Sequence, residues 1–166
     1  ASSRLDESER ARRESDRARE DAEAIARYLV EVFQSPDPEA DGRTITVAQS
    51  LDNAVAKLET DLADNPRRQA RLRATLGNTY RSLGIYDQAI TLLDQARTFA
   101  MGNLGNEHAE TLQVTNDLAL AFRDDRRAAE GIPLMEQVVK IRRRTLGPDH
   151  LETLAAMGDL ASCYAW

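Results

Sequence analysis

Apolar residues recur at helical spacing through much of the chain, and two neighbouring stripes of them are clear. The members of the first stripe lie three or four residues apart, on one face of a helix: Leu72, Leu76, Tyr80 and Leu83. The second stripe follows after a short break with similar spacing: Ala89, Leu92, Leu93, Ala96 and Phe99. Gly84 stands in the break, where glycine can adopt the left-handed conformation that ends many helices. The pattern predicts two antiparallel helices joined by a tight turn.

This helical pattern repeats with a period of 42 residues. The motif L-G-x-x-H-x-x-T-L begins at Leu104 and again at Leu146, and Asp117-Leu118-Ala119 returns as Asp159-Leu160-Ala161. A weaker copy one period earlier aligns Leu76 with Leu118. One helix pair cannot bury its apolar stripe alone, so neighbouring pairs must stack to complete a core. The sequence therefore predicts an array of stacked helix hairpins.

Two further patterns accompany these motifs: L-[AG]-x-x-[YF], and Tyr86-x-x-Ala89 before Leu92. Together they resemble the tetratricopeptide repeat family in its 42-residue, kinesin-light-chain-like form. The resemblance covers about residues 65–166. It implies an all-α fold, a right-handed superhelical array of antiparallel helix hairpins (an α-α solenoid). Before this array, residues 4–33 are heavily charged and contain no glycine or proline, and they predict a long N-terminal helix. The resemblance also implies that the chain binds a protein or peptide on the concave side of the array.

The organisation that follows has six parts. We expect a long charged N-terminal helix over 1–34, a loop over 35–45, a helix over 46–64 that pairs with the first, a repeat over 65–105, a second repeat over 106–147, and over 148–166 the first helix of a third repeat or a cap. Ser35-Pro36-Asp37-Pro38 ends the first helix, and Thr46-Val47-Ala48-Gln49 fits a capping box at the start of the next. Gly105 and Gly147 are expected to end helices as Gly84 does.

The N-terminal helix carries a heptad-like stripe that is weak in its first half, where it offers only alanine and serine. We expect that half to fray, project or pair weakly. Residues 22–33, which include Ile25, Leu29 and Val32, should dock on the repeats. A homo-oligomer formed through the N-terminal helix is left open.

Three positions depart from the repeat pattern. Arg126 replaces the glycine found at Gly84, so we expect a longer or less tight turn there. Gly131 replaces Ala89, which keeps a small contact and weakens the helix. Pro133 stands early in its helix, where it removes a backbone donor and is expected to kink the first turns.

Composition and candidate chemistry argue against catalysis. The 166 residues hold 22 Lys+Arg and 28 Asp+Glu, for a net charge of −6, which disfavours a general nucleic-acid binder. Arg142-Arg143-Arg144 and Arg67-Arg68 are interpreted as solvated basic clusters. His108 and His150 occupy the same place in successive repeats, and we interpret them as residues that bond across a helix start. Cys163 is expected to be a small buried residue. We predict no enzyme activity, no cofactor and no metal.

The apolar runs are too short for direct membrane insertion. The compartment is open: cytoplasmic, or extracytoplasmic if the chain is tethered to a membrane kinase.

The candidate binding residues are the polar ones on the first helix of each hairpin, which in the resembled family lines the concave side: Arg71, Asn78 and Arg81, and one repeat later Gln113, Asn116 and Arg123. An amide offers both a donor and an acceptor to a peptide backbone, and arginine binds carboxylates with two bonds. The alternative is that these are ordinary exposed residues. If these residues bind a partner, Asn78→Ala and Arg81→Glu should leave thermal stability nearly unchanged and weaken the binding. The lysines of the chaperone-type carboxylate clamp are absent.

A second resemblance suggests an alternative role. Asp37-Pro38, Thr46-Val47, Leu51-Asp52-Asn53-Ala54 and Leu76-Gly77-Asn78-Thr79-Tyr80 resemble the repeat region that follows the kinase domain in large bacterial serine/threonine kinases. It implies a regulatory, sensing or oligomerisation segment of a membrane-bound kinase. The sequence contains no kinase signature of its own.

Overall fold

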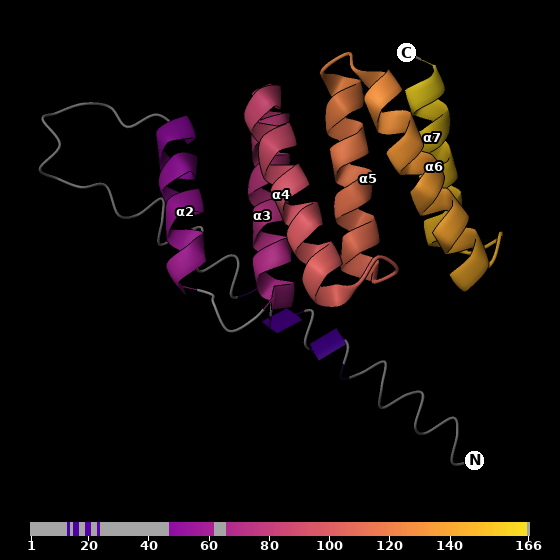
Figure 1. Ribbon diagram of the computed structural model, residues 1–166, viewed down its shortest axis with the longest axis horizontal. Coiled ribbons are helices and arrows are strands. Elements are labelled where there is room, and N and C mark those ends of the chain that lie inside the picture. Colours follow the sequence, from indigo (N-terminus) through magenta and orange to yellow (C-terminus); the bar gives the residue numbers. More distant parts are fainter. Residues whose placement is uncertain are drawn as a thin grey trace, which may run out of the picture. The chain divides into compact units, whose positions relative to one another are not determined.

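The structure is a computed structural model that describes residues 13, 15, 16, 19, 20, 23, 47–61 and 66–165. Residues 47–165 contain six described helices (Figure 1): α2 (Val47–Asp61), α3 (Pro66–Ser82), α4 (Tyr86–Leu104), α5 (Ala109–Asp124), α6 (Ala128–Thr145) and α7 (Leu151–Tyr164). These ranges contain no strand. The chain is thus an all-α helical repeat solenoid, as predicted.

Two compact units divide the chain, residues 1–56 and residues 57–166. In the first unit, the six described residues before position 24 are helical and exposed. In α2, Leu51 and Ala54 are fully buried. The remaining expectations for this region lie outside the described residues: the heptad stripe and its docking, the pairing with the 46–64 helix, the 35–45 loop and the Thr46 cap.

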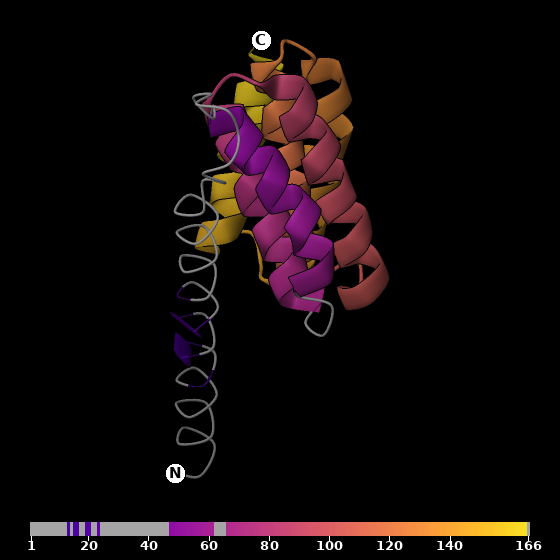
Figure 2. The ribbon, with the colours of Figure 1, turned by 90° about the vertical axis from the view of Figure 1, so that its left-hand side faces the viewer.

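The second unit has two layers of helices. The first helices of the hairpins form one layer, in which α3 contacts α5 and α5 contacts α7. The second helices form the other layer. Helix α4 packs on both α3 and α5, and helix α6 packs on both α5 and α7. In Figure 2, α4 and α6 lie on one side of this unit and α7 on the other. The face formed by α3, α5 and α7 is called the first-helix face below.

Aliphatic residues from consecutive helices form the core of this unit. One cluster joins α3, α4 and α5 through Ala74, Leu93 and Leu118. A second joins α5, α6 and α7 through Leu112, Val138 and Ala156. Because each cluster draws on more than one hairpin, the hairpins complete one another's cores, as the repeat pattern required.

The turn at Arg126 is as tight as the turn at Gly84, so the expectation of a looser turn is wrong. Gly84 has a φ of 73° and Arg126 a φ of 63°. In the first turn the Ile85 amide donates to the Tyr80 carbonyl at 2.9 Å; in the second the Arg127 amide donates to the Phe122 carbonyl at 2.8 Å. Both turns are therefore the same Schellman motif. Its two hydrogen bonds hold an arginine in a conformation that glycine adopts more easily.

In each of the two hairpins, α3–α4 and α5–α6, the helices approach closely at a glycine. The glycine lies on the first helix of one hairpin and on the second helix of the other. A Cβ added to Gly77 of α3 would lie 2.7 Å from a side-chain carbon of Leu93 on α4. One repeat later the glycine is on the second helix, and a Cβ added to Gly131 would lie 2.6 Å from the carbonyl oxygen of Ala119. Helix α6 also contains Pro133 and continues through it from Ala128 to Thr145.

Candidate functional site on the first-helix face

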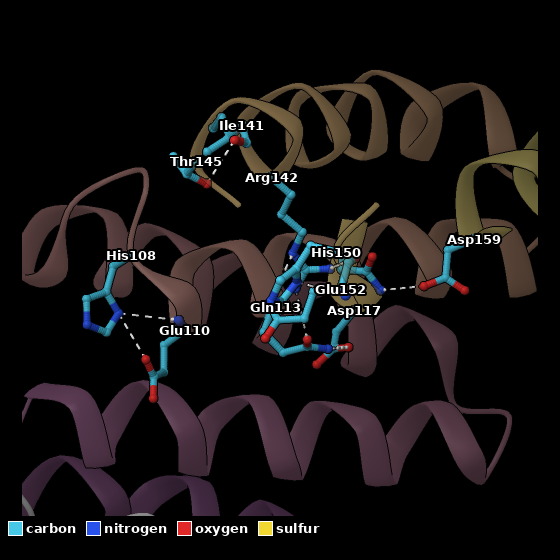
Figure 3. A network of polar contacts seen from close by, with 11 residues as sticks. His108, Glu110, Gln113, Asp117, Ile141, Arg142, Thr145, His150, Glu152 and Asp159 are labelled. Atoms are coloured by element: carbon cyan, nitrogen blue, oxygen red, sulfur yellow. Dashed lines mark hydrogen bonds and ion pairs between the residues drawn. The ribbon is translucent and has the colours of Figure 1, made fainter. Parts of the chain in front are cut away.

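Amide and carboxylate side chains link the first helices across the repeats. The Nδ2 of Asn78 on α3 donates to Oδ2 of Asp117 on α5 at 2.7 Å. The Nδ2 of Asn116 on α5 donates to Oδ2 of Asp159 on α7 at 3.0 Å. Figure 3 shows the bond that reaches Asp159. We call these two pairs the amide–aspartate ladder; they fix the spacing of α3, α5 and α7.

Asp117 lies at the centre of the ladder. It accepts a second hydrogen bond from Nε2 of Gln113 at 3.0 Å. Burial raises the pKa of the Asp117 carboxyl above its ordinary value, and nearby Asp159 adds to this. The hydrogen bonds from Asn78 and Gln113 and the charge of Arg81 act in the opposite direction and do not cancel the effect of burial. The two amide donors therefore stabilise a carboxylate that its surroundings disfavour.

Arginines make a second set of links near the C-terminal ends of the first helices. Arg81 on α3 approaches Asp124 on α5, with Nε 3.6 Å from Oδ2. Arg123 on α5 binds the same carboxylate at 2.7 Å and donates to Oγ of Ser162 on α7 at 2.8 Å. Both arginine side chains are about one-quarter exposed, so they are held in place and still reach the surface.

The six predicted residues therefore lie on adjacent helices, but they are not equally accessible. Gln113 is exposed, while Arg71, Asn78, Arg81 and Arg123 are half-buried. Asn116 is only 4% exposed, so its side chain positions α7 and does not offer its amide to a partner.

The hydrogen bond from Asn78 to Asp117 argues against the expectation that Asn78→Ala leaves stability unchanged. Removing Asn78 would take a donor from a carboxylate that burial already disfavours, a loss on the order of 1 to 3 kcal/mol. For Arg81 the expected loss is smaller, because its ion pair with Asp124 is longer and partly exposed.

Sequence reasoning missed the acidic half of the network. Asp117, Asp124 and Asp159 receive the donors of the predicted residues. One signal was available, because Asp117 and Asp159 are one repeat apart within the D-L-A motif. To assign their role, one would have to know that residues about one repeat apart in the sequence face each other on adjacent first helices.

The two histidines cap helices, as interpreted from the sequence. Nδ1 of His108 accepts the backbone amide of Glu110 at 3.3 Å, and Nδ1 of His150 accepts that of Glu152 at 3.2 Å. Figure 3 shows the first of these at the start of α5. Each histidine thus satisfies an amide that the helix itself leaves without an acceptor.

Two further interpretations can be compared with the structure. Cys163 is buried, 1% exposed, and burial raises the pKa of its thiol, which agrees with a small core residue. Arg142, in contrast, is not part of a solvated cluster. Its side chain is buried between repeats and donates to the Glu152 carbonyl at 3.2 Å and to Oε1 of Gln113 at 3.4 Å. Its long aliphatic stem allows this burial while the charged end keeps polar partners.

Within the described ranges, no group of three or more histidine, cysteine, aspartate or glutamate side chains is arranged to hold a metal ion. None of the described helices combines the length and apolar character that crossing a bilayer requires.

Comparisons with known proteins confirm the predicted resemblance. Residues 113–165 match the family model of the tetratricopeptide repeat. No curated protein sequence matches the chain.

Solved structures share the fold. BtubC (BKLC) from P. vanneervenii superposes with a TM-score of 0.61 at 16% identity, over 71% of this chain; the match spans 46% of BtubC, less than half of its length. Nearly identical TPR-like repeats of a putative kinesin light chain from Podosopora anserina superpose with a TM-score of 0.58 at 23% identity, over 90% of this chain and 86% of theirs. A point variant of the same repeats gives the same TM-score and identity, over 85% of its length.

Proposed function

We propose that the chain is a non-catalytic scaffold that binds a peptide or partner protein on the first-helix face. Tetratricopeptide repeats generally mediate protein–protein interactions, and arrays of this kind are typically not enzymes. The proposed contact residues are Gln113, Arg81, Arg123, Arg71 and Asn78, with Asn116 in a supporting position.

One observation carries the proposal: an ion pair holds Arg81, an ion pair and hydrogen bonds hold Arg123, and both side chains stay about one-quarter exposed on adjacent helices. A side chain that is already ordered loses less conformational freedom when it binds. Arginines held in this way suit a partner that presents carboxylates, since a guanidinium can bind a carboxylate with two parallel bonds. We therefore expect an extended peptide with acidic side chains.

The experiment selects ligands without assuming a partner. A phage-displayed library of random peptides is enriched on the chain, and the best peptide is titrated by calorimetry. Arg81→Ala on α3 should weaken binding about tenfold, which corresponds to about 1.4 kcal/mol. The matched control is Arg143→Ala, which removes an exposed arginine from α6 in the other layer and should leave the affinity unchanged.

A second matched pair removes an exposed amide from each layer, Gln113→Ala on α5 and Gln95→Ala on α4. Only the α5 change should weaken binding, and melting curves should show both variants folded. A library that yields no peptide above background would contradict the proposal, and so would peptides that bind all four variants like the parent chain.

The kinase-linked alternative stays a prediction. Among the segments that carry the resemblance, Asp37-Pro38 and Thr46 lie outside the described residues, and no contact in the described part favours a sensing or oligomerising role over partner binding.

A further inference from the structure

Arg142 is a buried charge whose polar contacts are mostly long. Its side chain extends from α6 toward Gln113 of α5 and Glu152 of α7 (Figure 3), and it is only 6% exposed. Nη1 donates to the backbone carbonyl of Glu152 at 3.2 Å, and Nη2 donates to Oε1 of Gln113 at 3.4 Å. Nε lies 3.7 Å from Oε2 of Glu152, beyond hydrogen-bond distance, and within the described part of the chain it has no hydrogen-bond partner. A charge that leaves water without a full set of hydrogen bonds is unfavourable, so the fold keeps this arginine at a cost in free energy.

The two longest contacts share one edge of the guanidinium group. Nε and Nη2 lie side by side on that edge, and their N–H groups point the same way, which matches the two oxygens of one carboxylate. Two different groups of the chain face this edge, the carboxylate of Glu152 and the amide oxygen of Gln113. A hydrogen bond between a guanidinium and a carboxylate is normally about 2.7–2.9 Å long. The edge of Arg142 is therefore covered, but its bonding capacity is not used.

The preceding repeat neutralises the equivalent acid in another way. Glu110 of α5 is one repeat before Glu152, and it accepts a hydrogen bond from Nε of Arg67 on α3 at 2.6 Å. One repeat after Arg67 the chain has Ala109, so the first-helix layer offers Glu152 no such arginine. The side chain of Glu110 is 11% exposed and that of Glu152 is 55% exposed. Glu152 is thus held much more loosely than its counterpart.

The arginine of the later repeat comes from the second-helix layer. Arg142 on α6 stands where α4 has Ala100, which is fully buried. The guanidinium therefore reaches α5 and α7 from below, and the side chains of Gln113 and Glu152 cover it. Both of these side chains are exposed, and so is Ala109, which replaces the arginine above them. Exposed side chains change rotamer within nanoseconds, so the edge of Arg142 can be uncovered without unpacking the core.

We infer that the Nε–Nη2 edge of Arg142 binds one carboxylate of an acidic partner peptide, and that Glu152 is an internal competitor which this carboxylate displaces. The site rests on the proposed function, since it adds a specific contact to the first-helix face. The incoming carboxylate accepts two hydrogen bonds from Arg142, and Glu152 turns into the solvent. Gln113 gives up its bond with Arg142 and keeps the one that it donates to Asp117. Because Glu152 is attached to α7 at a fixed point, its own carboxylate stays 3.7 Å from Nε.

The experiment measures whether removal of the competitor strengthens binding. The probe is a capped, fluorescently labelled oligoglutamate peptide, titrated with the 166-residue chain and followed by fluorescence anisotropy at low salt. Glu152→Gln should bind this peptide about fivefold more tightly than the parent, since the ligand no longer has to displace a carboxylate from Arg142. An oligoglutamine peptide of the same length should not bind either protein.

A matched control separates this effect from net charge. Glu107 is 56% exposed, nearly the same as Glu152, and it pairs with Arg144, which is itself 63% exposed. Glu107→Gln therefore changes the net charge by the same amount and releases an arginine that water already solvates. It should change the affinity by less than about twofold. Both variants alter exposed side chains, so both should keep the circular dichroism of the parent.

A second change locates the gain at Arg142. Arg142→Met retains a long apolar side chain in the buried space, and exchange of a buried charge for an apolar group of similar size is usually tolerated. This variant should bind the oligoglutamate about tenfold more weakly than the parent. In the Arg142→Met background, Glu152→Gln should act no more strongly than Glu107→Gln does. If Arg142→Met does not fold, the comparison between the two glutamine variants still decides.

The inference is overturned if Glu152→Gln and Glu107→Gln change the affinity equally, if the gain persists in the Arg142→Met background, or if neither the parent nor Glu152→Gln binds the oligoglutamate. Sodium acetate, exchanged for an equal concentration of sodium chloride, should not release the peptide. Release by acetate would assign the edge to a small carboxylic acid and would contradict a peptide site. The proposed function fails separately, if Arg81→Ala leaves the affinity for selected peptides unchanged.

Discussion

The crossing of α5 and α6 at Gly131 gives the sharpest prediction about the fold. In Gly131→Ala the new Cβ would lie 2.6 Å from the Ala119 carbonyl oxygen and 3.2 Å from its Cα and carbonyl carbon. These are backbone atoms, so no side chain can rotate away and the helices must separate. Overpacking of this kind costs about 1–3 kcal/mol. Alanine returns at most about 1 kcal/mol through its higher helix propensity, so the net loss should be about 0–2 kcal/mol.

A second glycine separates these two effects. Gly158 lies inside α7, and a Cβ added there would meet nothing within 4 Å. Gly158→Ala should therefore stabilise the chain by about 0.5–1 kcal/mol through helix propensity alone. The free energies of unfolding, measured by urea titration with circular dichroism, should differ between the two variants by about 1–3 kcal/mol. Equal stability of the two would refute the claim that the crossing requires a glycine.

The first hairpin suggests a rescue. It crosses with glycine on the first helix and alanine on the second, so Ala119→Gly combined with Gly131→Ala copies that arrangement into the second hairpin. Ala119→Gly alone should cost about 1 kcal/mol. If the crossing tolerates either order, the double variant should be more stable than the sum of the single losses by about 0.5 kcal/mol or more. Strict additivity would show that the two positions do not share a constraint.

Three further predictions follow from the turns, the caps and the ladder. Arg126→Gly should raise the free energy of unfolding by about 1 kcal/mol, because it relieves a left-handed conformation, and Gly84→Ala should lower it by a similar amount; a destabilised Arg126→Gly in urea titration would contradict this. His108→Ala should cost about 1 kcal/mol and His108→Asn much less, since asparagine also caps helices; equal melting temperatures for the two would argue against the cap. For Asp117 the pKa in the folded state is raised above that in the unfolded state, so the folded chain binds a proton on this carboxyl more tightly. Protonation of Asp117 therefore stabilises the fold. This stabilisation is complete below the unfolded pKa and is lost as the pH rises through the folded pKa. Relative to Asp117→Asn, the parent chain should thus gain stability in urea titrations as the pH falls through the acidic range. A pH-independent difference would show that the amide donors and Arg81 cancel the effect of burial, and a loss of stability as the pH falls would show that they outweigh it.

The period of 42 residues was sufficient to predict the helices and their stacking, because it follows the core itself. Leu76 and Leu118 are equivalent, and both are buried. The caps at His108 and His150 could be anticipated for the same reason, since a residue that recurs just before two helix starts points to a function at the helix start. The residues that repeat act within one hairpin, and such local features can be recognised from a single sequence.

The features that the sequence did not reveal depend on hydrogen bonds that the residue type alone does not predict. Arg142 belongs by composition to a basic run, yet its burial depends on Gln113 and Glu152, which come from two different helices. The Arg126 turn was misjudged because residue preference was given more weight than the two hydrogen bonds that hold the turn. In each case a chemically unfavourable residue is tolerated because contacts beyond the residue itself fix its conformation.

The same reasoning explains why stability and binding are coupled on the first-helix face. Polar side chains there join α3 to α5 and α5 to α7, so a partner meets groups that the fold already orders, and substitution there affects both stability and binding. Asn78→Ala cannot separate the two effects, because it removes a hydrogen bond to the buried Asp117 carboxylate. Arg81→Ala separates them better, because the ion pair that it removes is longer and partly exposed and contributes little to the free energy of unfolding.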